Sequence, residues 1–238
     1  YAFTGLSYSP DGQLLAVGGR NKNTEVFDPK TGELKYELPS HKFADVELAF
    51  SSDGSVLATL SPGDLSGPSF WNAASGERLS GGVSRDLMEN QADHFTLSPV
   101  VNHIAVDNHG GSIQIREFPS ELAIVNLSGH EGEVQALTYN PKGNRLASVG
   151  EDRLVRLWDP VSGDELITLA SGKNALKSIS FSPDGTMLVG TDGRKRIFFW
   201  DTRTQGQRAM DRKFAIALER KLEPIVASWL GRADGDSE

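Results

Sequence analysis

The sequence predicts an all-β fold, a β-propeller, followed by a helical segment. Three observations predict it: a turn that recurs at a steady spacing, a short apolar stretch after each turn, and an aromatic residue with a polar neighbour near the end of most units. Short strands at even spacing, with turns between them and an aromatic residue per unit, are typical of propellers. The repeat is therefore the starting point for the rest of the chain.

The recurrent turn begins with serine or asparagine and, except in the third copy, ends with glycine. The last residues of the five copies are 42, 48, 41 and 42 residues apart in turn: Gly12, Gly54, Asn102, Gly143 and Gly185. A period of this length indicates units that cannot bury their own apolar faces and stack against copies of themselves. We expect five such units, at about 1–40, 41–80, 81–128, 129–170 and 171–210.

Each unit is predicted to hold four short strands. An apolar strand follows the turn, a hairpin comes next, and a third strand ends in an aromatic residue with a polar neighbour. These endings are Phe27-Asp28, Trp71-Asn72, Trp158-Asp159 and Trp200-Asp201, with Arg116-Glu117 as a degenerate copy. One hairpin template is therefore reused along the chain.

The fourth unit carries the residues that identify a family. Its Gly129-His130, Ser148, Asp152 and Trp158-Asp159 resemble the pattern of WD40-repeat proteins, and the resemblance covers residues 1–206. The resemblance implies a WD40-type propeller in which His130, Ser148, Asp152 and Trp158 form a chain of side-chain hydrogen bonds. It assigns structural positions in other units to His41, Trp71 and Trp200.

Two units depart from this pattern. The second has a longer hairpin, at 62–68, and in the fifth Arg194 falls where the fourth has Asp152, with no Gly-His pair before the first strand. We expect these units to depend on apolar packing, worth about 2 kcal/mol per buried large side chain, rather than on the polar chain.

Five units are fewer than a closed propeller of this family usually has. Propellers of this family usually close with seven blades, and an open ring would leave unpaired strand edges that promote aggregation. The chain begins at Tyr1 rather than methionine. We expect the chain to be part of a larger, roughly seven-bladed propeller, or to close with other segments of the same or another chain.

After the fifth unit the period becomes helical. Between residues 211 and 230 apolar residues recur at steps of four, four, three and four, which indicates an amphipathic helix: Phe214, Leu218, Leu222, Ile225 and Trp229. Pro224 is expected to kink it or start a second helix. The helix either packs on the propeller or a neighbouring domain, or docks a partner. Residues 231–238 form an acidic tail.

Composition narrows the classes of function. The chain has 238 residues, no cysteine and a formal net charge of -8. Disulfides, cysteine zinc sites and thiol nucleophiles are therefore excluded, and a general nucleic-acid binder is disfavoured. No run of about 18 apolar residues is present, so no membrane insertion is expected, and the cytoplasm is the favoured location.

The sequence predicts no catalytic residues, metal site or cofactor. No phosphate-binding loop, nucleophile elbow or His-Glu-x-x-His motif occurs. His103, Asp107 and His109 would share one face of a strand, which is the arrangement closest to a metal site. On one strand, however, His103 and Asp107 would lie about 13 Å apart, too far to share an ion.

The remaining function is binding. The resemblance places the loops before each first strand and in each second hairpin on one face, which we call the loop face, where partner peptides often dock in this family. The expected partner-binding residues are Lys42, Asp45, Arg85, Asp86, Glu131, Glu133, Lys173 and Lys177. Two interpretations stay open: a non-catalytic scaffold for protein or peptide partners, or a regulatory or substrate-recruiting domain of a longer enzyme such as a kinase or hydrolase.

Overall fold

A computed structural model describes residues 3–19, 23–39, 47–60, 67–79, 92–108, 110–118, 120, 122–171, 174–192, 194 and 196–203. The chain divides into two compact units, residues 1–200 and 201–238, and the second is described only at 201–203. The predicted helix at 211–230 and the acidic tail at 231–238 therefore lie outside the described residues.

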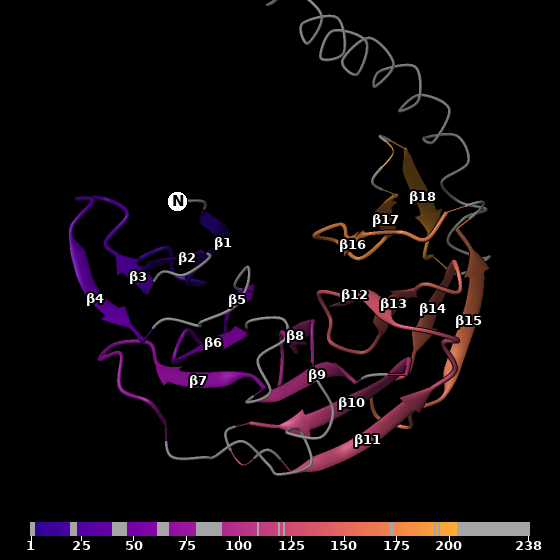
Figure 1. The fold of residues 1–238 in the computed structure, drawn as a ribbon, viewed down its shortest axis with the longest axis horizontal. Coiled ribbons are helices and arrows are strands. Elements are labelled where there is room, and N and C mark those ends of the chain that lie inside the picture. The colour runs from indigo at the N-terminus through magenta and orange to yellow at the C-terminus, as the bar shows by residue number, and fades with distance from the viewer. Residues whose placement is uncertain are drawn as a thin grey trace, which may run out of the picture. The chain divides into compact units, whose positions relative to one another are not determined.

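The described residues form five antiparallel sheets and no helix, which confirms the all-β prediction (Figure 1). The number of blades, their boundaries and ring closure stay predictions. No helix able to cross a membrane occurs within the described ranges.

In each sheet the strand order follows the chain. The first sheet comprises β1 (Phe3–Tyr8), β2 (Leu15–Gly19), β3 (Thr24–Phe27) and β4 (Leu34–Leu38). The second comprises β5 (Glu47–Phe50), β6 (Val56–Leu60) and β7 (Ser69–Asn72). The third comprises β8 (Phe95–Leu97), β9 (His103–Asn108), β10 (Ser112–Glu117) and β11 (Ala123–Ser128). The fourth comprises β12 (Val134–Tyr139), β13 (Leu146–Gly150), β14 (Leu154–Trp158) and β15 (Glu165–Ala170). The fifth comprises β16 (Ser178–Phe181), β17 (Met187–Thr191) and β18 (Ile197–Asp201).

The recurrent turn joins the first two strands of a sheet through one repeated set of hydrogen bonds. The serine hydroxyl donates to the aspartate two residues later at 2.6 Å, in the pairs Ser9 with Asp11, Ser51 with Asp53, and Ser182 with Asp184. The same hydroxyl accepts the backbone N–H five residues on, at 2.9 to 3.0 Å. The hydrogen bonds that each aspartate accepts, the one from the serine hydroxyl first among them, hold its pKa low, to about 2 for Asp184. The motif that sets the period therefore also builds the turn.

Neighbouring turns lie close to one another. A Cβ added to Gly185 would lie 3.4 Å from the Pro141 ring, and one added to Gly143 would collide with Val100. Gly143 has a φ of +67°, a left-handed conformation that other residues adopt at a cost. The third turn, which lacks glycine, thus fits its Val100 against the glycine of the fourth.

Apolar side chains pack between consecutive sheets. The first strands of successive sheets contact each other in chain order, β1 with β5, β5 with β8, β8 with β12 and β12 with β16. Between the third and fourth sheets, Ile113 and Leu127 meet Tyr139, Leu146 and Trp158 in one buried cluster. Removing such side chains from water is the main stabilising contribution to the fold.

The third sheet has an aromatic contact outside the strand-end pattern. The sequence places Arg116 where other units have an aromatic residue, and Arg116 is indeed buried in β10. Two residues later, the ring of Phe118 stacks on Phe70 of β7, with centroids 5.4 Å apart and planes 6° from parallel. The second and third sheets are therefore joined by an aromatic pair that the strand-end pattern did not reveal.

Candidate functional site

A buried chain of hydrogen bonds runs through the fourth sheet. Trp158 Nε1 donates to Ser148 Oγ at 2.8 Å, Ser148 Oγ lies 2.8 Å from His130 Nε2, and His130 Nδ1 lies 2.9 Å from Asp152 Oδ2. Because an ionised carboxylate only accepts, Nδ1 carries the proton and Nε2 accepts from the serine hydroxyl. Every donor in the chain then has an acceptor.

The electrostatics fit this assignment. Burial lowers the pKa of His130, and the opposing influence of Asp152 does not outweigh it, so the ring is neutral. Burial alone would raise the pKa of Asp152, but the hydrogen bonds from His130 and the N–H of Leu154 hold it below its usual value. A neutral imidazole beside an ionised carboxylate is the state that the hydrogen-bond chain requires.

The same carboxylate fixes the loop that precedes β12. Asp152 Oδ2 accepts the backbone N–H of Glu131 at 3.2 Å, and Glu151 N–H donates to the carbonyl of Glu133 at 2.9 Å. Glu131 and Glu133, two of the predicted partner-binding residues, are exposed on this loop. The buried chain therefore positions the backbone from which both glutamates project.

The second sheet repeats part of this arrangement. Trp71 Nε1 donates to Thr59 Oγ1 at 3.0 Å, as Trp158 does to Ser148. His41, the histidine expected in this unit, lies outside the described residues. Thr59 on β6 therefore accepts the hydrogen bond of the Trp71 indole, as Ser148 does for Trp158 at the equivalent position of the fourth sheet.

The fifth sheet has a polar link that the sequence interpretation missed. Asn174 Nδ2 donates to Asp192 at 3.1 Å, and Asp192 also accepts from Arg196 Nε at 2.7 Å and the N–H of Arg194 at 3.0 Å. The expectation for this unit is apolar packing rather than the His-Ser-Asp-Trp chain, and the link from Asn174 to Asp192 is a different polar connection beside that packing. Trp200 does pack against the apolar cluster, and its ring stacks on Phe198 with centroids 5.9 Å apart.

The third sheet uses an aspartate in a similar way. Asp107 on β9 accepts the backbone N–H groups of Asp93 and His94 at 2.9 and 2.8 Å, just before β8 begins. Asp107, Asp152 and Asp192 each bind the segment that enters the first strand of their sheet, and we call them the anchoring aspartates. In the sequence they stand at different offsets, so no single motif marks all three.

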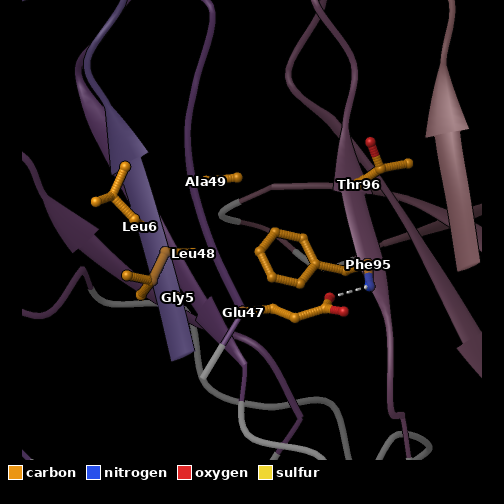
Figure 2. Close-up of a pocket in the computed structure, with 7 residues that line it drawn as sticks. All are labelled: Gly5, Leu6, Glu47, Leu48, Ala49, Phe95 and Thr96. Carbon is orange, nitrogen blue, oxygen red and sulfur yellow. Dashed lines mark hydrogen bonds between the residues drawn. The ribbon is translucent and has the colours of Figure 1, made fainter. Parts of the chain in front are cut away.

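Glu47 connects two sheets at the start of their first strands. Its carboxylate lies 2.8 Å from His94 Nδ1 and accepts the backbone N–H of Phe95 at 3.0 Å. Figure 2 shows the Glu47 side chain reaching from β5 toward Phe95 on β8. Burial acts to lower the pKa of His94, but Glu47 together with Asp107 and Asp93 raises it. A charge-assisted contact thus links the second and third sheets.

Two hollows adjoin this contact. The larger hollow, of about 340 Å³, lies over β1, β5 and β8, and is lined by Gly5, Leu6, Glu47, Leu48, Ala49, Phe95 and Thr96 (Figure 2). The smaller hollow, of about 210 Å³, is lined by Glu47, His94, Phe95, Gln135, Ala136, Leu137, Lys177, Ser178 and Ile179. The smaller hollow therefore brings together residues at the starts of four first strands.

The predicted partner-binding residues are placed unequally. Lys177 lines the smaller hollow, where its ammonium donates to Gln135 Oε1. Glu131 and Glu133 lie on the loop before β12, outside both sets of lining residues. Lys42, Asp45, Arg85, Asp86 and Lys173 lie outside the described residues.

Sequence reasoning missed Glu47, His94 and Gln135 in this hollow. Aligning the repeats on the first residue of each first strand would have found them, because all stand within one residue of that point, as Lys177 does. As for metals, the part of the chain that the structure describes contains no group of three histidines or carboxylates able to hold an ion. Asp107 instead faces backbone N–H groups.

Comparison with known proteins agrees with this architecture. A family model described as "WD domain, G-beta repeat" matches residues 2–28, 122–159 and 163–201. The nuclear distribution protein PAC1 of Coccidioides posadasii is 27% identical over 178 residues, which cover 66% of this chain and 36% of that protein. The B-type cell cycle switch protein ccs52B of Medicago truncatula is 28% identical over 159 residues, covering 65% of this chain and 32% of that protein.

A third relative is aligned over more of the chain. Periodic tryptophan protein 2 of Arabidopsis thaliana is 28% identical over 200 residues, covering 83% of this chain and 22% of that protein. This chain thus spans between about a fifth and just over a third of the length of these relatives. The matched stretches contain β1 to β3, β11 to β14 and β15 to β18, so three segments of this chain carry WD40 repeats.

Proposed function

We propose that this chain is a non-catalytic interaction scaffold that binds proteins or peptides through the loop face, the end of the sheets at which the first strands begin. The observation that carries the proposal is the gathering of Glu47, His94, Gln135 and Lys177 from four sheets around one hollow at that end. Binding residues are commonly held at such ends, on loops that a rigid scaffold positions.

The anchoring aspartates support this function because they fix the loop face before a partner arrives. Asp107, Asp152 and Asp192 each hold the segment that leads into a first strand, through the N–H of His94, the N–H of Glu131 and the amide of Asn174 respectively. Binding to a preorganised surface costs less conformational entropy than ordering a loose one. The scaffold thus offers a fixed set of charged and polar groups to its partner.

Charge reversal tests the proposal. A triple variant, Glu131→Lys, Glu133→Lys and Lys177→Glu, changes the loop face, and the partners captured by this variant are compared with those of the wild type. The matched control, Glu33→Lys, Glu77→Lys and Lys142→Glu, makes the same exchanges in exposed turns beyond the opposite strand ends. We expect the loop-face variant to lose partners that the control keeps. If both variants capture the same partners, the loop face is the wrong surface.

The alternative, a regulatory or substrate-recruiting domain of a longer enzyme such as a kinase or hydrolase, is favoured by one comparison. The relatives described above are roughly three to five times as long as the stretch they share with this chain. The mass of the native protein in its own cells separates the two proposals. A native mass near 25.8 kDa, that of this chain, would remove the alternative.

A further inference from the structure

The side-chain carboxylate and amide oxygens that line the smaller hollow each accept a hydrogen bond already. Both carboxylate oxygens of Glu47 are engaged, one with His94 Nδ1 and one with the N–H of Phe95. Gln135 Oε1 accepts from the ammonium of Lys177. The Ser178 hydroxyl is paired with that of Thr191. The nitrogen groups that face the hollow add donors: the other N–H groups of Lys177, the amide NH₂ of Gln135 and, on a protonated ring, Nε2–H of His94.

The charges in the smaller hollow also favour an anionic ligand. Glu47 is balanced by His94 at 2.8 Å, whereas the structure records no ion pair for Lys177 within the described part of the chain. Asp107 and Asp93 also act on His94 from its own sheet, and Lys177 shares the hollow with it. With Glu47, the two aspartates raise the pKa of His94 against the effect of burial and favour the protonated ring.

We propose that the smaller hollow binds a single anionic side chain of a peptide partner, a carboxylate or a phosphoryl group, through Lys177, Gln135 and His94. This inference rests on the proposed function, because it names the chemistry that the loop face recognises. A charged donor facing a carboxylate makes one of the stronger hydrogen bonds in proteins.

The size and surroundings of the hollow restrict the ligand to one such group. About 210 Å³ is smaller than the roughly 300–1,000 Å³ typical of sites for drug-sized molecules, so it suits one side chain. Phe95, Leu137 and Ile179 supply apolar walls for the methylene groups. The exposed Glu131 and Glu133 on the neighbouring loop would repel a run of acids, which favours an isolated acidic residue.

A selection experiment tests the inference. A displayed library of random peptides is selected on the full chain and on its Lys177→Met variant, with Lys142→Met as a matched control in an exposed turn. We expect the wild type and the control to enrich peptides that share one Asp or Glu. A synthetic winner should bind the Lys177→Met variant at least about tenfold more weakly, the cost of losing a charged hydrogen bond.

The outcomes distinguish failure of the inference from failure of the proposed function. Peptides that bind in competition with one another but share no acidic residue would overturn the inference and leave the scaffold in place. Failure to enrich any peptide would overturn both. Replacing the shared acid with glutamine should abolish binding, and equal binding of the glutamine peptide would refute anion recognition.

The source of the anion and the role of His94 are tested with the same peptide. A version with phosphoserine in place of the acid shows by its affinity whether a phosphoryl group or a carboxylate fits better. Binding should weaken as the pH rises through the pKa of His94, because the ring then loses its Nε2 proton. A pH-independent affinity would remove His94 from the site.

Discussion

Asn174 donates a 3.1 Å hydrogen bond to Asp192, and the two residues take the place in the fifth sheet that His130 and Asp152 take in the fourth. Asn174 and His130 each stand four residues before the first strand of their sheet. The aspartates do not correspond in this way, because Asp152 precedes Trp158 by six residues and Asp192 precedes Trp200 by eight. The fifth sheet therefore keeps a hydrogen bond between the loop before its first strand and its second hairpin, but the aspartate that accepts it stands at a different position in the repeat.

Replacing Asp192 with alanine is therefore expected to destabilise the fifth sheet. The change removes the acceptor for Asn174, Arg196 and the N–H of Arg194 at once. Urea denaturation should give a lower midpoint for Asp192→Ala than for Arg194→Ala, in which only an exposed side chain is lost. Equal midpoints for the two variants would contradict the anchoring role.

The difference in stability between the wild type and Asp192→Ala should become smaller at low pH. Burial would raise the pKa of Asp192, but hydrogen bonds from Arg196 and Asn174 outweigh it and hold the pKa well below the usual value. An acid with a depressed pKa stabilises the fold above its unfolded pKa and loses that contribution as the pH falls. The stability of the wild type and of Asp192→Ala should thus converge in strong acid.

The shifted aspartate shows which features the sequence could predict. Some features are local patterns at a fixed spacing: the recurrent turn, the aromatic strand ending, and the His-Ser-Asp-Trp set of the fourth unit. The all-β repeat and the residues of that set could therefore be located from the sequence. Asp192 and Phe118 could not, because a hairpin that changes length moves the contact to another residue. Glu47 and His94 could not either, since their contact joins two sheets and depends on packing across the repeat.

Ser148→Ala should be costly for the fourth sheet. Ser148 is fully buried and bonds both Trp158 Nε1 and His130 Nε2 at 2.8 Å, so alanine leaves two buried groups without a partner. An unsatisfied buried polar group costs about 1–3 kcal/mol. We expect the free energy of unfolding to fall by about 2 kcal/mol in denaturant titrations. Ser180→Ala, at an exposed site on β16, serves as the control and should change little.

Gly143→Ala should be more destabilising than Gly12→Ala, although both glycines have a φ of +67°. A Cβ at Gly12 meets nothing within 4 Å, whereas one at Gly143 collides with Val100. The backbone strain of about 1–2 kcal/mol is common to both, and displacing the exposed Val100 side chain adds about 1 kcal/mol at Gly143. Val100→Ala should recover the added part in a double-mutant cycle. Additive effects of the two changes would show that the turns do not touch.

Asp107→Asn should stabilise the protein at neutral pH. Burial raises the pKa of Asp107 from 3.8 to about 6, against the hydrogen bonds from His94 and Asp93. An acid whose pKa is raised by folding binds its proton more tightly in the folded state, so the wild type loses stability as the pH rises from about 4 to about 6. Asparagine can keep the acceptor oxygen without the buried charge.

The difference between Asp107→Asn and the wild type should accordingly be small near pH 4 and reach the order of 2 kcal/mol above pH 6. The raised pKa of His94 also makes stability fall as the pH rises through it; the contact with Glu47 is present in both proteins, but Asp107→Asn loses the part of that contribution that comes from the Asp107 charge. Asp164→Asn, a change of the same type in an exposed turn, is the control. If the difference in stability between Asp107→Asn and the wild type does not change with pH, folding leaves the pKa of Asp107 unchanged. In that case the hydrogen bonds to its carboxylate offset the effect of burial on the pKa.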